Sequence, residues 1–215
     1  METLKPSKTN IARAVQILKH GGVVMYPTET SYALGADARK RSAVAKIFKL
    51  KGRTKEKTFP LIVTSKLMAH LYSQNIRSQE DPFGIGTKLE QKYWPGPLTI
   101  VAPLAFAAKL RSYRSFAANE LAPGIRAKNG TIALRVSSHP VARALSRGIG
   151  GPIIATSANR AGEPSAYTVK DALKGLHGTP DLVLDAGRLP RRRPSTIVQV
   201  VGGKMKILRQ GSIKI

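Results

Sequence analysis

The chain has 215 residues, of which 42% are hydrophobic and 22% charged, and this is enough for one ordered α/β domain with a buried core and a substantial cleft. Because it contains no cysteine, the sequence excludes disulfides, cysteine-ligated zinc, iron–sulfur clusters and thiol catalysis. Lys and Arg number 36 against 12 Asp and Glu, and a formal net charge of +24 favours polyanionic partners such as nucleic acid and nucleotides.

The first expected elements are a helix and a strand that ends in polar residues. Apolar side chains recur at helical spacing over residues 11–18, and Thr9 or Asn10 is expected to cap this helix. The strand VVMY at residues 23–26 is followed by Pro27 and the polar sequence TETS. In open α/β sheets, ligands usually bind beyond the carboxyl ends of strands, so this loop is a candidate site.

A second amphipathic helix leads into a strongly basic segment. Its apolar residues lie within 43–50, and the segment KLKGRTKEK at residues 49–57 begins in its last turn. Lys51 and Arg53 can converge on one anion, with Lys as a compact charge and Arg as a bidentate fork. Cations in this position are also stabilised by the helix dipole, so a solvated helix end is the alternative interpretation.

From residue 131 the chain alternates strands and helices and then closes with a hairpin. Thr168 and Asp171 have capping-box-like spacing, and Gly202 and Gly203 are typical of a two-residue hairpin turn. Strands are expected at 131–136, 152–157, 182–187, 196–201 and 205–210, and helices at 141–147 and 169–176. This order predicts an α/β fold with a twisted, mixed sheet covered by helices.

Three positions in this half carry side chains suited to a nucleotide or an anion. Ser157 and Asn159 end an apolar run and point to the same side of an extended segment, where they either bind phosphate or ribose or serve as ordinary turn residues. Arg135 lies inside an apolar run, and a buried cation there needs a carboxylate from the protein or an anionic ligand. The sequence has no Walker loop, so a nucleotide would be bound without one.

Taken together, seven segments of the chain resemble the YrdC family. They stand in family order over about residues 10–212 and include the KxR pair of that family, at Lys51 and Arg53, and its SxN pair, at Ser157 and Asn159. The matching segments are GGVVMYPTETSYALGADA, IFKLKGRTKEKTFPLIV, WPGPLTIVAP, IALRVSSHPVARAL, GGPIIATSANRAGEPSA, PSTIVQV and ILRQGSI. Each segment alone is a modest signal, and their common order carries the resemblance.

The resemblance implies an α/β fold whose twisted sheet bends around a large, positively charged cavity. It also implies a synthase that joins L-threonine, bicarbonate and ATP into threonylcarbamoyl-AMP and pyrophosphate, with Mg²⁺ accompanying the ATP. A partner transferase would then move the threonylcarbamoyl group to an adenosine beside the anticodon of tRNA. The chain departs from the family at three positions: Thr54 and Thr58 stand where proline is common, and Ala33 stands where glycine is common.

Residue roles follow from the same resemblance. Lys51 and Arg53 would hold the triphosphate and neutralise charge that develops in the reaction, which makes them the expected catalytic pair. The residues expected at ATP are Lys51, Arg53, Thr131, Ser157, Asn159 and Arg209. The residues expected at L-threonine are Thr28, Arg135 and Ser195. No metal ligand is expected from the protein itself.

We expect an N-terminal extension over residues 1–9 and one YrdC-like domain over residues 10–215. No segment is apolar enough for a membrane span or a signal peptide, so a cytoplasmic location is expected. The alternative function is RNA binding without synthase activity, because residues 188–215 carry many cations and no carboxylate. A carbamoyl-transfer domain of hydrogenase maturation is a third possibility, but such proteins have cysteine-rich zinc fingers and this chain has no cysteine.

Overall fold

The computed structural model describes residues 1–53, 58–73, 84–105, 121–160, 162–201 and 203–215, and these form an α/β fold with two sheets. The first sheet has the strand order β1 (Glu2–Leu4), β9 (Leu182–Leu184), β2 (Val24–Pro27), β3 (Tyr32–Gly35) and β8 (Thr156–Ser157). The second has the order β11 (Lys204–Arg209), β10 (Thr196–Val201), β5 (Leu98–Pro103), β6 (Thr131–Val136), β4 (Leu61–Val63) and β7 (Ile153–Ile154). Both contain parallel and antiparallel pairs, so the predicted mixed α/β class is confirmed.

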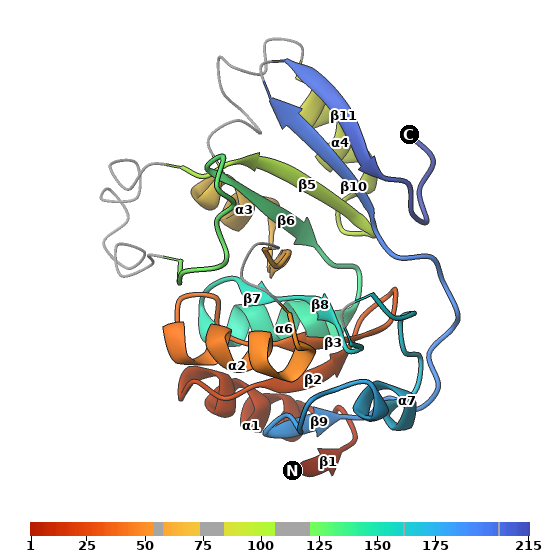
Figure 1. Ribbon diagram of the computed structural model, residues 1–215. Helices are drawn as coiled ribbons and strands as arrows, with labels where there is room; N and C mark the ends of the chain where they lie inside the picture. Colours follow the sequence, from red (N-terminus) through yellow and green to blue (C-terminus); the bar gives the residue numbers. More distant parts are fainter. Residues whose placement is uncertain (54–57, 74–83, 106–120, 161, 202) are drawn as a thin grey trace.

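Helices flank both sheets (Figure 1). The lower half of the view holds the first sheet with α1 (Lys8–Lys19), α2 (Arg41–Lys51), α6 (Pro140–Ile149) and α7 (Val169–Lys174). The upper half holds β5, β6, β10 and β11 of the second sheet with α3 (Lys66–Tyr72) and α4 (Ile85–Tyr93), while β7 lies in the lower half beside α6. None of the described helices combines the length and the apolar character that crossing a membrane requires.

The N-terminal residues are part of the first sheet. Strand β1 pairs in parallel with β9 and forms one edge of that sheet. Helix α1 begins at Lys8, and its N-cap is Ser7, whose Oγ accepts a hydrogen bond from the Asn10 amide at 3.1 Å. The predicted caps, Thr9 and Asn10, are therefore wrong, because both lie in the first helical turn. The expected boundary after residue 9 also falls within this helix.

Helix α2 ends beside the candidate site. Its buried side chains Ala43, Val44, Ile47 and Leu50 follow the helical spacing expected from the sequence. The helix stops at Gly52, whose φ of 55° lies in the left-handed region that favours glycine. This turn places Lys51 at the end of the helix and directs the chain toward β4.

The apolar run at residues 152–157 is divided between the two sheets, and the prediction of one strand there is wrong. Strand β7 pairs with β4 in the second sheet, whereas β8 pairs with β3 in the first. Between them, the Ala155 amide donates a hydrogen bond to the Pro60 carbonyl at 2.9 Å. Ile153 and Ile154 of β7 and Thr156 of β8 are all buried, so burial continues across the break and the apolar pattern alone did not reveal it. The run therefore joins the two sheets.

Other connections agree with the sequence. Thr168 caps α7, since its Oγ1 accepts a hydrogen bond from the Asp171 amide at 3.1 Å. Strands β10 and β11 form the expected antiparallel pair, although Gly202 lies outside the described residues. The segment between β9 and β10 runs from the first sheet to the second along one side of the molecule (Figure 1).

The core holds the two sheets together. Its larger cluster of buried side chains contains Met25 and Leu34 from the first sheet and Leu61, Leu98 and Leu134 from the second. A smaller cluster lies where α1 and α6 pack near β2 and β9. Burial of apolar area at about 25 cal/mol per Å² is the main favourable term, and here it acts across both sheets. Packed strands and helices therefore lie on both sides of the space between the two sheets.

Candidate active site

A cavity of about 740 Å³ opens between the two sheets. Its walls come from the turn after β2, the end of α2, strands β5, β6 and β8, and the β10–β11 pair. Eight of the nine predicted site residues line it: Thr28, Lys51, Arg53, Arg135, Ser157, Asn159, Ser195 and Arg209. The ninth, Thr131, is not among the described residues that line the cavity, and its Oγ1 donates a hydrogen bond to Asn129 Oδ1 at 2.8 Å.

Charged side chains on the described part of the lining are mostly cationic. The cations are Lys51, Arg53, Arg135, Arg160 and Arg209, and the one carboxylate among the described lining residues is that of Glu163. Arginine and lysine form charge-assisted hydrogen bonds to phosphates and carboxylates, and arginine can do so through two parallel bonds. The volume falls within the range of about 300–1,000 Å³ that is usual for small-molecule sites.

Lys51 lies in the wall of the cavity and is only 2% exposed. Its Nζ donates hydrogen bonds to the carbonyl oxygens of Ser157 at 2.5 Å and Asn159 at 2.6 Å, and lies 3.4 Å from Asn159 Oδ1. Burial and the neighbouring Arg53 cation lower the pKa of Lys51 to about 8. The KxR and SxN pairs, about a hundred residues apart in sequence, therefore meet through this ammonium group.

Arg53 has a hydrogen-bond donor that no described residue pairs with. Its Nη2 donates a hydrogen bond to the Thr58 carbonyl at 3.1 Å, and its guanidinium carbon lies 4.9 Å from the centre of the Phe59 ring. Its Nε is buried and has no hydrogen-bond partner among the described residues. Burial also lowers the pKa of Arg53. A buried donor without a partner costs free energy.

Asn159 is held at both ends of its side-chain amide. Its Nδ2 donates a hydrogen bond to the Glu163 carbonyl, while Oδ1 faces Lys51. The residue before it, Ala158, donates its backbone amide to the Tyr32 carbonyl at 2.9 Å. These contacts fix the segment after β8 against the first sheet, so the SxN residues occupy a defined position on the lining.

Arg135, on β6, already has a protein carboxylate as a partner. Its Nη1 lies 3.2 Å from Glu29 Oε1, and both side chains are less than 10% exposed. Glu29 Oε2 accepts a hydrogen bond from Ser137 Oγ. The sequence indicated that Arg135 needs an anion from the protein or from a ligand, and the structure supplies Glu29; the threonine-binding role of Arg135 stays a prediction. Glu29 belongs to the TETS sequence, but nothing in the spacing of residues 29 and 135 indicated this pair.

Ser195 and Arg209 form a second hydrogen-bonded group on the lining. The Arg209 guanidinium donates to the Ser195 carbonyl through Nε at 3.0 Å and Nη2 at 2.8 Å, and also reaches Ser195 Oγ at 3.0 Å. Ser195 Oγ lies 2.9 Å from Thr99 Oγ1, and Thr99 also lines the cavity. Thr99 was not predicted as a site residue, because a threonine within an apolar strand is common and carries no specific signal.

Thr28 shapes the turn between β2 and β3. Its Oγ1 donates a hydrogen bond to the Ser31 carbonyl at 2.7 Å and accepts hydrogen bonds from the amides of Thr30 and Ser31, each at 3.2 Å. Thr28 is 3% exposed, and Thr30 and Ser31 line the same cavity. The hydroxyl of Thr28 therefore sets the backbone that faces a ligand, in addition to any contact that it makes itself.

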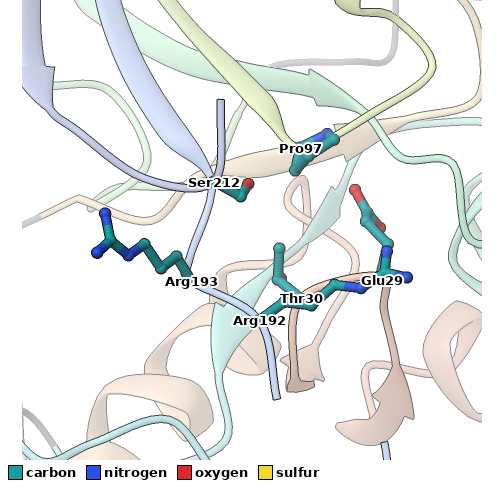
Figure 2. A pocket seen from close by; sticks show the side chains of 6 residues that line it. All are labelled: Glu29, Thr30, Pro97, Arg192, Arg193 and Ser212. Atoms are coloured by element: carbon teal, nitrogen blue, oxygen red, sulfur yellow. The ribbon is translucent and has the colours of Figure 1, made fainter. Parts of the chain in front are cut away.

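A second, smaller cavity of about 440 Å³ lies next to the first, and Thr30 lines both. Figure 2 shows Glu29 and Thr30 on the turn after β2, with Pro97 and Ser212 across from them. Arg192 and Arg193, from the segment that precedes β10, complete the lining. Glu29 thus faces the smaller cavity, whereas its partner Arg135 faces the larger one.

Curated relatives are similar in sequence to this chain over almost its whole length. Threonylcarbamoyl-AMP synthase of Marinobacter nauticus is 33% identical over 205 residues, which cover 94% of this chain and 97% of that protein. Threonylcarbamoyl-AMP synthase of Bacillus subtilis is 33% identical over 216 residues, and the match covers 99% of this chain but 56% of that longer protein.

Solved structures show the same fold. P. abyssi Sua5 complexed with L-threonine is 26% identical with a TM-score of 0.80, and the match covers 98% of this chain and 56% of the Sua5 chain. E. coli YciO is 23% identical with a TM-score of 0.77, and 98% of this chain and 93% of that chain are covered, which supports the fold alone. The family model for Sua5, YciO and YrdC, described as telomere recombination, matches residues 16–211. The chain belongs to the Sua5/YciO/YrdC family.

Proposed function

We propose that this protein is an enzyme, an L-threonylcarbamoyladenylate synthase that transfers the adenylyl group of ATP to a carbamate of L-threonine. The observation that carries the proposal is that the KxR and SxN residues, together with Arg135, Ser195 and Arg209, line one cavity. The relatives named threonylcarbamoyl-AMP synthase, at 33% identity, support the same reaction.

On the nucleotide side, Lys51 and Arg53 bind the triphosphate. The buried Nε of Arg53 lacks a hydrogen-bond partner among the described residues, which fits a donor that awaits a phosphate oxygen. Ser157 and Asn159 position the nucleotide at the end of β8, and Arg209 adds a guanidinium from the opposite sheet. Thr131 is not among the described lining residues, so its role at ATP is exerted through the loop that includes Asn129.

On the threonine side, Arg135 binds the substrate carboxylate, and Thr28 and Ser195 border the same space. The threonine amine, once deprotonated, attacks the carbon of CO₂ or bicarbonate and forms an N–C bond; with bicarbonate, a hydroxide leaves and takes up a proton as water. An oxygen of the resulting carbamate attacks the α-phosphorus of ATP. The bond from this phosphorus to the bridging oxygen breaks, and pyrophosphate leaves with the bonding electrons.

Catalysis in this scheme depends on position and charge. The cations of the cavity neutralise the negative charge that grows on the α-phosphate of the transferred adenylyl group and on the pyrophosphate. Binding the two substrates side by side converts a bimolecular reaction between them into an effectively unimolecular step. Neither effect requires a dedicated general base from the protein.

Mg²⁺ would enter with the triphosphate. Among the described residues, no group of three or more His, Asp or Glu side chains is arranged to hold a metal ion. Mg²⁺ is commonly held by substrate phosphates, water and one or two carboxylates, and Glu163 is the carboxylate among the described residues that line the cavity. The bound ion would supply further neutralisation of phosphate charge.

The product would be used in the cytoplasm for tRNA modification. Threonylcarbamoyl-AMP is a reactive mixed anhydride, so a transferase must receive it and pass the threonylcarbamoyl group to tRNA. The carboxylate-free segment 188–215, with exposed Arg188, Arg191, Arg192 and Arg193, would attract tRNA near the site of synthesis.

The test is pyrophosphate release from ATP, bicarbonate and Mg²⁺ with and without L-threonine, with Lys51→Ala as the matched variant. We expect release that requires L-threonine and falls strongly in the variant, with threonylcarbamoyl-AMP detected by mass spectrometry. Release that ignores L-threonine, or none from folded protein, would refute the proposal. RNA binding with steep salt dependence and no synthase activity would then be the supported function.

A further inference from the structure

Glu29 is a buried carboxylate that none of the predicted roles uses. Its side chain is 6% exposed and lies between two residues of the segment that contains β6. Oε1 lies 3.2 Å from Arg135 Nη1, and Oε2 accepts the hydrogen bond of Ser137 Oγ. Ser137 Oγ in turn accepts a hydrogen bond from the His139 amide at 3.1 Å. A chain of contacts therefore links His139, the N-cap residue of α6, through Ser137 to Glu29, and Glu29 contacts Arg135 in turn.

The two partners of this ion pair face different spaces. Arg135 lines the larger cavity, whereas Glu29 lines the smaller one and is not among the described residues that line the larger. Figure 2 shows Glu29 on the wall of the smaller cavity, next to Thr30. Through its contact with Arg135, Glu29 can therefore act on a ligand in the larger cavity without lining that cavity itself.

The ion pair restricts the guanidinium. A free arginine side chain has many rotamers, and holding one of them costs entropy at the time of binding unless the protein has already done so. At 5% exposure Arg135 also needs a nearby anion when no ligand is present. One oxygen of Glu29, Oε1, makes the ionic contact but has no hydrogen-bond partner among the described residues. Arg135 Nη1 is therefore held by charge attraction and keeps its capacity to donate a hydrogen bond to a ligand.

We propose that Glu29 is a positioning residue that fixes the guanidinium of Arg135 for the carboxylate of the amino-acid substrate. This inference rests on the proposed function, since it needs Arg135 to bind L-threonine. The opposite effect is physically possible, because a carboxylate beside Arg135 also competes with the substrate carboxylate. If competition dominates, removing the charge of Glu29 tightens binding; if positioning dominates, removal weakens it.

The experiment measures kcat and KM for L-threonine and for ATP in the wild type, Glu29→Gln, Glu29→Asp and Ser137→Ala. Misplacement of a binding group by about 1 Å can cost about 100-fold, so we expect Glu29→Gln to raise the KM for L-threonine by about 10-fold to 100-fold. The KM for ATP should change by less than about twofold, since Glu29 does not face the KxR pair. Glu29→Asp, which keeps the charge, should recover part of the loss.

Glu90→Gln is the matched control. Glu90 is another carboxylate that is 3% exposed and paired, with His70 Nε2 at 2.6 Å, and it lines neither described cavity. If Glu29→Gln acts only by destabilising the fold, both variants lower the melting temperature and neither changes the KM for L-threonine. If Glu29→Gln does not fold, Ser137→Ala, which frees Glu29 but keeps its charge, takes its place with a smaller rise in the same KM.

A double variant separates positioning from other effects. In an Arg135→Lys background, Glu29→Gln should add much less to the KM for L-threonine than it does in the wild type, because its effect passes through the guanidinium. An unchanged or lowered KM for L-threonine in Glu29→Gln, with the wild type active, would overturn the inference. A wild type without threonine-dependent activity would instead overturn the proposed function on which it rests.

Discussion

The buried ammonium of Lys51 should make the stability of this protein depend on pH in the alkaline range. In the folded chain, burial and then Arg53 lower the pKa of Lys51 from 10.5 to about 8. A pKa difference of this size corresponds to about 3 kcal/mol between the charged and neutral forms. Two carbonyl oxygens bond Nζ at 2.5 and 2.6 Å and favour the charged form, so about 3 kcal/mol is the upper value for this site.

The sign follows from proton binding. Between pH 8 and 10.5 the unfolded chain holds a proton on Lys51 that the folded chain has released, so the free energy of unfolding rises with pH across this window. Below pH 8 both states are protonated, and the folded protein carries the full cost of the buried charge. Above pH 10.5 both are neutral and this cost is absent. The slope in the window is at most about 1.4 kcal/mol per pH unit.

The perturbation is Lys51→Met, which keeps the length of the side chain and removes the titrating group. The assay is urea unfolding of wild type and variant at several pH values from 7 to 10.5, which spans the window set by the pKa. The wild type should gain up to about 3 kcal/mol relative to the variant over this range. Lys49→Met, on the exposed side of the same helix, is the matched control. The wild type should show no such gain in the free energy of unfolding relative to Lys49→Met. A constant difference between wild type and Lys51→Met would refute the reasoning.

Three further outcomes are expected. ATP affinity, measured by titration calorimetry, should fall as pH rises above about 8, by up to about tenfold per pH unit, because neutral Lys51 no longer attracts phosphate, and Lys51→Met should lose this dependence. Arg53→Lys should raise the KM for ATP by about tenfold or more, because the contact with the Phe59 ring and the fork of donors are lost. Tyr32→Phe should lower the free energy of unfolding, measured in urea, by about 1–3 kcal/mol. The variant loses the hydrogen bonds that the Tyr32 hydroxyl makes with Asp185 Oδ1, at 3.0 Å, and with two backbone groups.

Much of the architecture was predictable from local pattern. The spacing of apolar residues indicated α2, and the Thr168 and Asp171 pair indicated the start of α7. The cap of α1 was misplaced by two residues or more because serine, threonine and asparagine stand close together before the apolar run, and each is a good cap. The division of residues 152–157 between two sheets depends on pairing with β4 and β3, which no local pattern contains.

The residues of the site were easier to predict than their interactions. Residue type and family order selected eight positions that line the larger cavity. Whether each polar group is free for a ligand depends on partners far away in sequence. Arg135 finds Glu29 at 3.2 Å, and the same arginine without that partner would have looked identical in the sequence.

Lys51 and Arg53 differ in how far their hydrogen-bond donors are already paired within the described protein, so we expect them to play different roles within the KxR motif. The ammonium of Lys51 already donates to the carbonyls of Ser157 and Asn159, so it joins two walls of the cavity as well as supplying charge. The Nε of Arg53 has no hydrogen-bond partner among the described residues, so it is available to donate to a ligand while Nη2 keeps its bond to the Thr58 carbonyl. Loss of Lys51 should therefore change both stability and ATP binding, whereas Arg53→Lys should change ATP binding and shift the urea midpoint less than Lys51→Met does. Equal losses of stability in both variants would show that the motif acts as one structural unit.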